Sequence, residues 1–308
     1  MNANKLAGVL CPVVTPFKAD LSPDPTRFAA HCRWLLDQGC AALAIFGTTS
    51  EANSLSVEER LSLFDDLLQA GIPAERLLPG SGCCALSDSL RLTRHFVAAG
   101  AAGVLTLPPF YYKGVSDEGL FRSYAQLVER VGDARLRLYL YHIPQMTQVP
   151  LSLPLIDRLL TAYPGAVAGI KDSSGDAAHL ATLLATFAGR DFSVFPGSEL
   201  LLLAGLRGGG AGCITATANV NPAAIVEVFR TWRQADADLR QVRLDALRQT
   251  IQAFPLIPAV KATIAHCSGD AHWLTLRPPL VELDAPQRAD LATRLAALDF
   301  AMPGLAAG

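Results

Sequence analysis

The sequence predicts an α/β protein with a (β/α)8 barrel followed by a C-terminal helical appendage. Short apolar runs alternate with amphipathic stretches from the first residues to about residue 222. The runs are apolar almost throughout, which is typical of parallel strands that are buried on both faces. Beyond residue 222 the strand pattern stops and helical patterns continue. We therefore assign residues 1–222 to the barrel and residues 223–308 to a C-terminal helical region.

Eight apolar runs are the predicted strands, and eight strand-then-helix units favour a closed barrel. The alternative is an open doubly wound sheet, but no Gly-x-Gly-x-x-Gly pattern follows the first run. The predicted strands are residues 8–14, 42–46, 76–80, 103–107, 136–142, 167–171, 192–195 and 212–216.

The predicted helices lie between these strands and in the tail. The clearest covers residues 56–71, where Ser56 and Glu59 form a capping box and Gly71 ends the apolar periodicity. Asn221-Pro222 opens the first tail helix as a cap followed by proline. The other predicted helices are residues 87–100, 116–131, 152–163 and 176–187, and in the tail 222–236, 238–254, 255–267 and 285–298.

Composition limits the classes of function. The 308 residues are 51% hydrophobic and 18% charged, as expected for one large globular unit. A formal charge of −2 predicts no binding to nucleic acid. The chain has no apolar run long enough to span a membrane, and residues 5–14 lack the cleavage pattern of a signal peptide. We therefore expect a cytoplasmic protein.

Cysteine and histidine usage predicts neither disulfides nor a metal. The seven cysteines include no Cys-x-x-Cys pair and lie mostly in apolar stretches, so we interpret them as reduced and buried thiols. The six histidines form no His-x-x-His or His-Glu-x-x-His pattern. We expect a chain that works without a metal or another cofactor.

Lys171 is the first candidate for chemistry. In a barrel of this kind the active site gathers at the C-terminal ends of the strands. Lys171 ends the run 167–171, and it is the only one of the five lysines to close an apolar strand. Burial there favours the neutral amine, which can attack a carbonyl carbon. On spacing alone, a lysine paired with Asp172 is an equally good interpretation.

Two neighbouring strand ends carry groups that suit such an amine. Tyr141 shares its parity with Tyr139, so both side chains face one side of the strand, and Tyr141 is placed to carry protons. A packed ring with a satisfied hydroxyl is the plainer alternative. Gly47, Thr48 and Thr49 offer hydroxyls and successive backbone N–H groups, which suit a carboxylate. A turn that caps the next helix is the alternative for this segment.

Together these motifs resemble the dihydrodipicolinate synthase / N-acetylneuraminate lyase family of pyruvate-dependent class I aldolases, over nearly the whole chain. Four motifs, each at a predicted strand end, carry the resemblance. They are Gly47-Thr48-Thr49-Ser50-Glu51, Phe110-Tyr111-Tyr112 ahead of Glu118-Gly119-Leu120, Tyr141-His142-Ile143-Pro144, and Gly169-Ile170-Lys171-Asp172-Ser173-Ser174.

The resemblance implies roles for the matching residues. Lys171 would form the Schiff base with a 2-oxo acid, and Tyr141 would be the general acid/base. Thr48 and Thr49, beside Gly47, would bind the pyruvyl carboxylate.

The resemblance also implies a pocket wall and an assembly. Gly197 and Ile214 would line the pocket. Tyr112, or else Tyr111, would sit at a subunit contact and reach a neighbour's site. The implied assembly is a homotetramer built as a dimer of dimers.

The sequence departs from the family pattern at two positions. Met146 stands where dihydrodipicolinate synthases carry an arginine that holds a substrate carboxylate, and Ser50 stands where glycine is usual. The predicted ends of strands seven and eight also carry no basic residue, which argues against a phosphorylated substrate. We therefore expect Met146 to lie in the substrate pocket and the partner aldehyde to be uncharged.

The predicted function is a Schiff-base-forming lyase that reversibly cleaves a 2-oxo-3-deoxy or 4-hydroxy-2-oxo acid to pyruvate and an aldehyde. Condensation of pyruvate with aspartate semialdehyde, as in a 4-hydroxy-tetrahydrodipicolinate synthase, is the alternative that Met146 disfavours. The sequence also leaves open a 2-oxo-3-deoxy acid dehydratase that acts through the same imine, and a non-catalytic 2-oxo acid binder.

Overall fold

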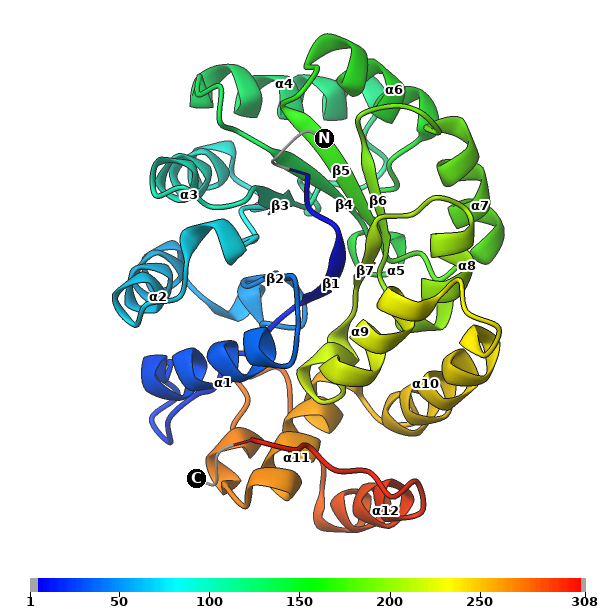
Figure 1. The fold of residues 1–308 in the computed structure, drawn as a ribbon. Coiled ribbons are helices and arrows are strands. Elements are labelled where there is room, and N and C mark those ends of the chain that lie inside the picture. The colour runs from blue at the N-terminus through cyan, green and yellow to red at the C-terminus, as the bar shows by residue number, and fades with distance from the viewer. Residues whose placement is uncertain (1–4, 306–308) are drawn as a thin grey trace.

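The computed structural model of the chain describes residues 5–305 and shows a ring of strands surrounded by helices (Figure 1). Every strand pairing is parallel, in two sheets with the orders β2-β1-β7 and β3-β4-β5-β6. The strands are β1 (Gly8–Cys11), β2 (Ala42–Leu43), β3 (Val104–Thr106), β4 (Leu138–His142), β5 (Val167–Asp172), β6 (Ser193–Pro196) and β7 (Gly212–Ile214).

The two sheets join at both edges into a closed barrel. On one side, residues 77–80 form parallel bridges to β2 and to β3. On the other, the N–H of Ala211 donates to the carbonyl of Val194, 2.9 Å away, and so links β7 to β6. Eight parallel segments therefore close the ring, and the predicted (β/α)8 barrel, a TIM barrel, is confirmed.

Regular strand is shorter than predicted in the first part of the chain. Of the predicted strand 76–80, residues 77–80 complete the wall through isolated bridges, after the short 3-10 helix η2 (Ala74–Arg76). Pro79 within this segment has no N–H to donate to a ladder. β1 likewise stops before Pro12, and beyond β2 the chain turns through Phe46, whose φ is 59°.

A β-bulge fixes the register of the two longest strands. Leu138 of β4 pairs with Val167 of β5, but the next residue, Tyr139, pairs with Gly169. Ala168 is thus the extra residue of the bulge. From there the pairing is regular and brings Tyr141 opposite Lys171.

Helices cover the outside of the ring, as predicted. The predicted helices α2 (Val57–Gln69), α3 (Leu86–Ala98), α4 (Asp117–Val131), α6 (Leu153–Ala162), α7 (Ala177–Thr186) and α9 (Pro222–Thr231) are all present. α2 has the expected capping box of Ser56 and Glu59. The sequence patterns did not identify α1 (Pro25–Asp37), although Asp24 caps it and proline begins it, or α8 (Leu202–Arg207).

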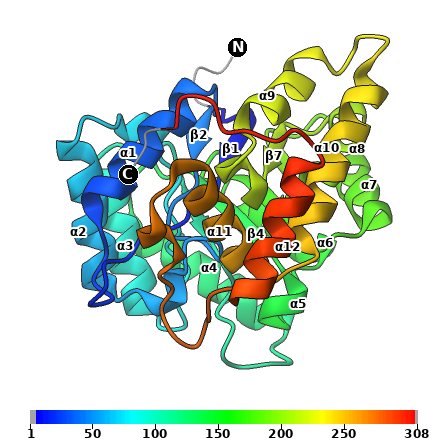
Figure 2. The same ribbon diagram turned by 90° about the horizontal axis from the view of Figure 1, so that it is seen from below.

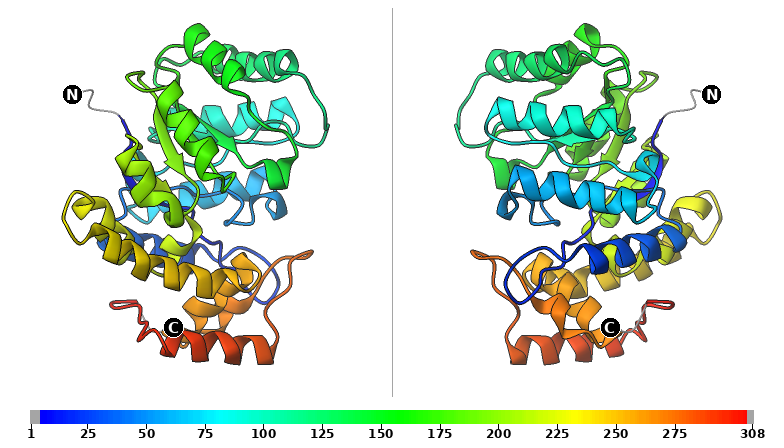
Figure 3. Two further views of the ribbon diagram at one scale, coloured as in Figure 1. Left: turned by 90° about the vertical axis from the view of Figure 1, so that its right-hand side faces the viewer. Right: turned by 90° about the vertical axis from the view of Figure 1, so that its left-hand side faces the viewer.

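The C-terminal helices form an added layer on one side of the barrel (Figures 2 and 3). They are α10 (Ala237–Gln252), α11 (Leu256–Ser268) and α12 (Ala285–Ala296), and α12 packs against the other two. Asp284 and Gln287 form a capping box at α12. The division of the chain at residue 222 stays a prediction. Among the described helices, none has the length and apolar character needed to cross a membrane.

Alternate strand residues fill the inside of the barrel. Residues of the opposite parity, such as Leu140 and Ile170, join a separate core between the strands and the helices. The inner cluster contains Leu10, Ala42, Ala44, Leu78, Leu105, Tyr139, Tyr141, Ile143, Phe195 and Ile214. It forms a packed floor beneath the C-terminal ends of the strands, with Tyr141 near its upper limit.

We expect Gly80→Ala to destabilise the barrel. A Cβ at Gly80 would lie 2.0 Å from the carbonyl oxygen of Phe46, so a backbone segment has to move. Overpacking of this kind costs about 1–3 kcal/mol. Gly119→Ala is the control, because a Cβ there meets only Ser116 Oγ, at 3.7 Å, in helix α4, and alanine should stabilise that helix by about 0.5–1 kcal/mol. Urea midpoints of the two variants should shift in opposite directions. Equal midpoints would contradict the crowding at Gly80.

Candidate active site

Lys171 and Tyr141 lie side by side at the C-terminal ends of β5 and β4. Both are buried, with 4% and 3% of their surface exposed. The Lys171 Nζ group donates a hydrogen bond to Tyr141 Oη, 3.2 Å away, and lies 4.4 Å from the centre of the tyrosine ring. The sequence predicted both positions, and the structure brings the amine and the phenol into direct contact.

The Tyr141 hydroxyl has a second polar neighbour. Thr48 Oγ1 lies 3.4 Å from Tyr141 Oη. Burial alone would raise the pKa of Tyr141, but the positive charge of Lys171 and the hydrogen bond with Thr48 together lower the pKa below its ordinary value. A phenol with a lowered pKa exchanges its proton more readily, which suits it to acid/base chemistry.

These groups lie in a cavity of about 350 Å³ at the C-terminal mouth of the barrel. That volume is enough for a small ligand. Strand ends, the segment after β6 and the C-terminal helices all contribute to its wall. The lining residues are Thr48, Thr49, Tyr141, Ile143, Gln145, Lys171, Asp172, Ser173, Gly175, Gly197, Ser198, Leu200, Leu201, Ala216, Arg248, Gln252 and Leu256.

The loop after β2 carries Thr48 and Thr49 into the cavity wall. We call residues 47–51 the threonine loop. It is a tight turn, because the N–H of Glu51 donates to the carbonyl of Thr48 at 3.1 Å. The N–H of Gly47 donates to Ser50 Oγ, 3.3 Å away, inside the loop. Gly47 is not among the residues that line the cavity, contrary to expectation, and Ser50 Oγ takes up its N–H inside the loop.

The predicted Gly197 is on the cavity wall, beside a residue that the sequence analysis missed. Ser173, two residues after Lys171, also lines the cavity, and its Oγ is buried without a hydrogen-bond partner among the described residues. A Cβ at Gly197 would lie 2.0 Å from that oxygen. Glycine at this position thus leaves the room that Ser173 occupies.

Two predicted pocket residues lie elsewhere. Ile214 is fully buried in the inner cluster of the barrel, below the cavity. Met146 lies in the short helix α5 (Pro144–Thr147) and is 63% exposed. The chain begins this helical turn at Pro144, so Gln145 faces the cavity instead, and its Nε2 donates to the carbonyl of Ser173 at 2.6 Å. The expectation that Met146 lies in the pocket is therefore wrong.

Tyr111 and Tyr112 are not part of the cavity of their own chain. Each is 73% exposed, in the connection between β3 and α4, and their rings meet edge to face at 5.3 Å. Lys113 anchors this connection to α5, because its Nζ donates to the carbonyls of Phe110 and of Thr147.

Arg248 of α10 is a cation in the cavity wall that the sequence analysis did not identify. Its Nη1 donates to Glu199 Oε2 and to Thr215 Oγ1, both at 3.3 Å, and its Nε donates to Gln252 Oε1 at 3.1 Å. Glu199 also accepts hydrogen bonds from the hydroxyls of Thr215 and Thr217. Besides Lys171, the cavity thus contains a basic residue that a helix distant in sequence supplies, although the ends of the last two strands carry none.

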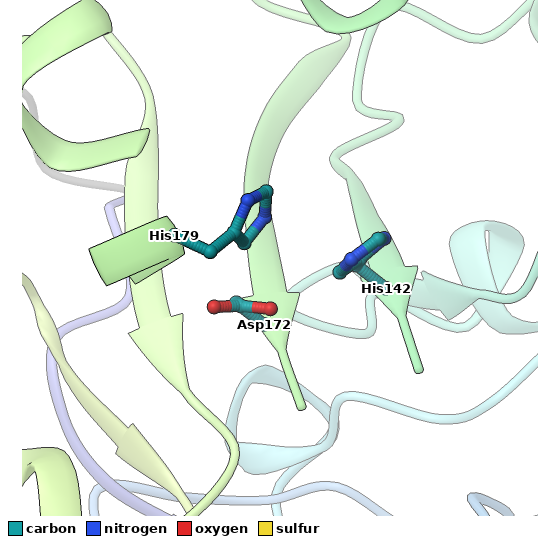
Figure 4. A group of neighbouring side chains, drawn as sticks. All are labelled: His142, Asp172 and His179. Atoms are coloured by element: carbon teal, nitrogen blue, oxygen red, sulfur yellow. The ribbon is translucent and has the colours of Figure 1, made fainter. Parts of the chain in front are cut away.

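A second polar cluster lies behind this site, between the barrel wall and α7 (Figure 4). His142 and Asp172 follow Tyr141 and Lys171 and so face outward, where His179 of α7 joins them. Each offers one possible metal ligand, and these atoms lie within 4.8 Å of one another. The cluster is the one place among the described residues where three such groups meet in this way.

The hydrogen bonds of His142 argue against metal ligation through its ring. His142 Nδ1 accepts the N–H of Leu151 at 3.1 Å, so the proton of the neutral ring is on Nε2. Burial lowers the pKa of His142; Asp172 opposes this shift and His179 adds to it. A ligating histidine needs a lone pair on the atom that faces the metal and a proton on the other nitrogen. His142 shows the opposite tautomer, which suits a hydrogen-bond donor.

Comparisons with known proteins agree with this geometry. Residues 5–298 match the model of the "Dihydrodipicolinate synthetase family". An "uncharacterized DapA-like lyase" of Chloroflexus aurantiacus is 34% identical over 286 residues, which cover 92% of this chain and 94% of the relative.

Solved structures are similar over almost the whole chain. Dihydrodipicolinate synthase from Agrobacterium tumefaciens superposes with a TM-score of 0.88 at 33% identity, covering 95% of this chain and 99% of that one. YagE, a prophage protein of the dihydrodipicolinic acid synthase family from Escherichia coli K12 solved with pyruvate, gives a TM-score of 0.87 at 29% identity, with coverages of 96% and 99%.

Proposed function

Because the chain belongs to the dihydrodipicolinate synthetase family and is a lyase of that family, we propose that Lys171 forms a Schiff base with a 2-oxo acid, most simply pyruvate. The contact of 3.2 Å between Lys171 Nζ and Tyr141 Oη in a buried cavity is the observation that carries the proposal. It joins a nucleophilic amine to a proton-transfer group, which is the arrangement that imine chemistry needs. Pyruvate in the similar YagE structure supports the choice of ligand.

The proposed reaction is reversible cleavage of a 2-oxo-3-deoxy or 4-hydroxy-2-oxo acid. The amine of Lys171 attacks the C2 carbonyl carbon, and water leaves with a proton that Tyr141 supplies. Tyr141 then accepts the proton of the C4 hydroxyl. The C3–C4 bond breaks, its electron pair moves to the imine nitrogen, and the C4 oxygen becomes the aldehyde carbonyl. Protonation at C3 and hydrolysis of the imine release pyruvate and the free amine.

The threonine loop is the proposed carboxylate site. Thr48 and Thr49 are the loop residues in the cavity wall, and Thr48 Oγ1 lies 3.4 Å from Tyr141 Oη. A carboxylate bound there would hold the C2 carbonyl of the same ligand next to Lys171. The loop is thus proposed to orient the 2-oxo acid, which is how positioning groups accelerate a reaction between bound partners.

The C-terminal helices are proposed to bind the aldehyde portion. Arg248 and Gln252 of α10 and Leu256 of α11 form one wall of the cavity. Because Glu199 offsets the charge of Arg248, this wall suits hydroxyl groups on an uncharged chain.

The second candidate is condensation of pyruvate with aspartate semialdehyde. Arg248 favours this reaction because it could bind the carboxylate of aspartate semialdehyde, while the sequence has no arginine at position 146.

The proposed assembly is a homotetramer built as a dimer of dimers, with Tyr112 reaching a neighbour's site. Four exposed apolar side chains on the β3–α4 connection and α5 support a contact there, namely those of Tyr111, Tyr112, Val115 and Met146. A cytoplasmic location and independence of a metal or other cofactor stay predictions as well.

Lys171 should be the lysine that borohydride traps with pyruvate. Its amine is at the cavity floor, whereas Lys113 lies on the outer loop and Lys261 is fully buried against Glu51. Peptide mapping by mass spectrometry locates the reduced adduct. Lys171→Arg should give no adduct, because a guanidinium stays protonated. An adduct on another lysine of the wild-type protein would refute the assignment.

Tyr141→Phe should fold normally and lose turnover by about 10²–10⁴-fold, as is usual when a proton-transfer group is removed. Tyr124→Phe is the matched control, since Tyr124 is equally buried but contacts Thr106 outside the cavity. Steady-state rates of pyruvate release measure the effect. A near wild-type rate for Tyr141→Phe would leave this tyrosine with a packing role alone.

The double variant Arg248→Met with Glu199→Gln should impair the distal end of the cavity alone. It removes both members of the pair and so leaves no unpaired buried charge. Loss of a hydrogen bond to a charged group costs about 1.5–3 kcal/mol, so cleavage of the best 2-oxo-3-deoxy acid should fall at least about 10-fold in kcat/KM. Trapping with pyruvate alone should be unchanged.

The same assays separate the two candidate reactions. For the wild type, we expect aspartate semialdehyde to be consumed with pyruvate less efficiently than the best 2-oxo-3-deoxy acid is cleaved. If the wild type consumed aspartate semialdehyde as efficiently as it cleaved the best 2-oxo-3-deoxy acid, and the Arg248→Met, Glu199→Gln variant lost both activities, the synthase reaction would be favoured.

A further inference from the structure

The threonine loop is held in a conformation that its own sequence disfavours. Phe46, just before it, and Glu51, at its end, have φ angles of 59° and 55°. This left-handed region suits glycine, and residues with a side chain are strained there. Such residues persist where the surrounding structure over-determines them. The contacts of Glu51 therefore identify what holds the loop.

Glu51 is held from the C-terminal region. Its Oε1 accepts a hydrogen bond from Lys261 Nζ at 2.5 Å, and its Oε2 accepts the N–H of Arg277 at 3.1 Å. Lys261 also donates to the carbonyl of Thr275 at 2.8 Å and lies 4.6 Å from the ring centre of Phe17. Lys261 has no exposed surface, and Glu51 is 4% exposed. The two charges thus depend on each other.

Arg277 also joins the C-terminal region to the residues that follow the threonine loop. Its guanidinium donates to the carbonyl of Ser54 at 2.6 Å and pairs with Glu59, whose side chain completes the capping box of α2. The segment after α11 is therefore fixed to both ends of the connection that follows the threonine loop. Neither Lys261 nor Glu51 lines the cavity, so the pair touches no substrate.

We propose that Lys261 is a positioning residue, which holds the threonine loop through Glu51 in the shape that binds the pyruvate carboxylate. The inference rests on the proposed role of Thr48 and Thr49 as the carboxylate site. Within the threonine loop, the N–H of Glu51 donates to the carbonyl of Thr48, so a shift of Glu51 moves Thr48 directly.

The double variant Lys261→Met with Glu51→Gln tests the proposal, because it removes both charges at once. Borohydride trapping is measured by intact-mass spectrometry over a range of pyruvate concentrations, and in parallel with methyl pyruvate, which has no carboxylate. We expect the half-saturating concentration to rise about 10-fold for pyruvate and to stay unchanged for the ester, since a small misplacement of a binding group has effects of that order. A structural loosening of the whole site would instead raise both values.

Two further proteins complete the experiment. The double variant Arg27→Met with Asp270→Asn removes another ion pair between α1 and the C-terminal region, and it should leave both ligands unaffected. Lys261→Arg keeps the charge in a different shape and should show a smaller rise for pyruvate alone. It also serves if the first double variant fails to fold. Near-UV circular dichroism monitors folding.

Three results would overturn the proposal. The first is an unchanged half-saturating concentration of pyruvate in a folded Lys261→Met, Glu51→Gln protein. The second is an equal rise in the half-saturating concentration of methyl pyruvate in that protein. The third is the same rise for pyruvate in the Arg27→Met, Asp270→Asn control. Failure of the wild-type protein to be trapped by pyruvate at all would instead refute the proposed Schiff base.

Discussion

The register between β4 and β5 decides which side chains face the cavity. Successive residues of a strand point to opposite faces, so a slip of one residue exchanges the two sets. Here the bulge at Ala168 brings Tyr141 opposite Lys171 on the inside and His142 opposite Asp172 on the outside. Without the extra residue, Tyr141 would meet Ile170, and the amine would have no phenol beside it. The bulge thus brings the amine of Lys171 and the phenol of Tyr141 together.

Groups near one another in sequence were predictable, because the strand period fixes their direction. Lys171 and Tyr141 were identified from their place at the ends of apolar runs, and the structure brings them together. The order of the barrel and most of its helices followed from the same patterns. Met146 was predicted to lie in the pocket, but Pro144 begins a helical turn there. Side chains then follow the helical period in place of the alternation of a strand, and Met146 points to solvent. A motif that resembles a family pattern therefore does not fix the position of a side chain beyond such a turn.

Long-range contributions could not be predicted from local patterns. Arg248 lies on the buried side of α10, between Leu244 and Ile251, but the local pattern does not show which carboxylate pairs with it. Its burial depends on Glu199, which is distant in sequence but in direct contact with it, and on how α10 packs. The partner of Glu51 could not be predicted for the same reason, since Lys261 lies 210 residues further along the chain although the two side chains are in contact. Buried charges are placed by tertiary packing, and a single sequence shows only that they exist.

The position of Lys261 in the chain has a consequence for synthesis. A ribosome adds about 5–20 residues per second, so Lys171 is made some seconds before the C-terminal helices. A nascent chain that ends short of α11 contains the reactive amine and both threonines but has nothing to hold Glu51 in its left-handed conformation. Truncated translation products would contain Lys171 but lack the contacts that hold the proposed carboxylate site. With the proposed roles, the substrate site can form only after α11 has been synthesised.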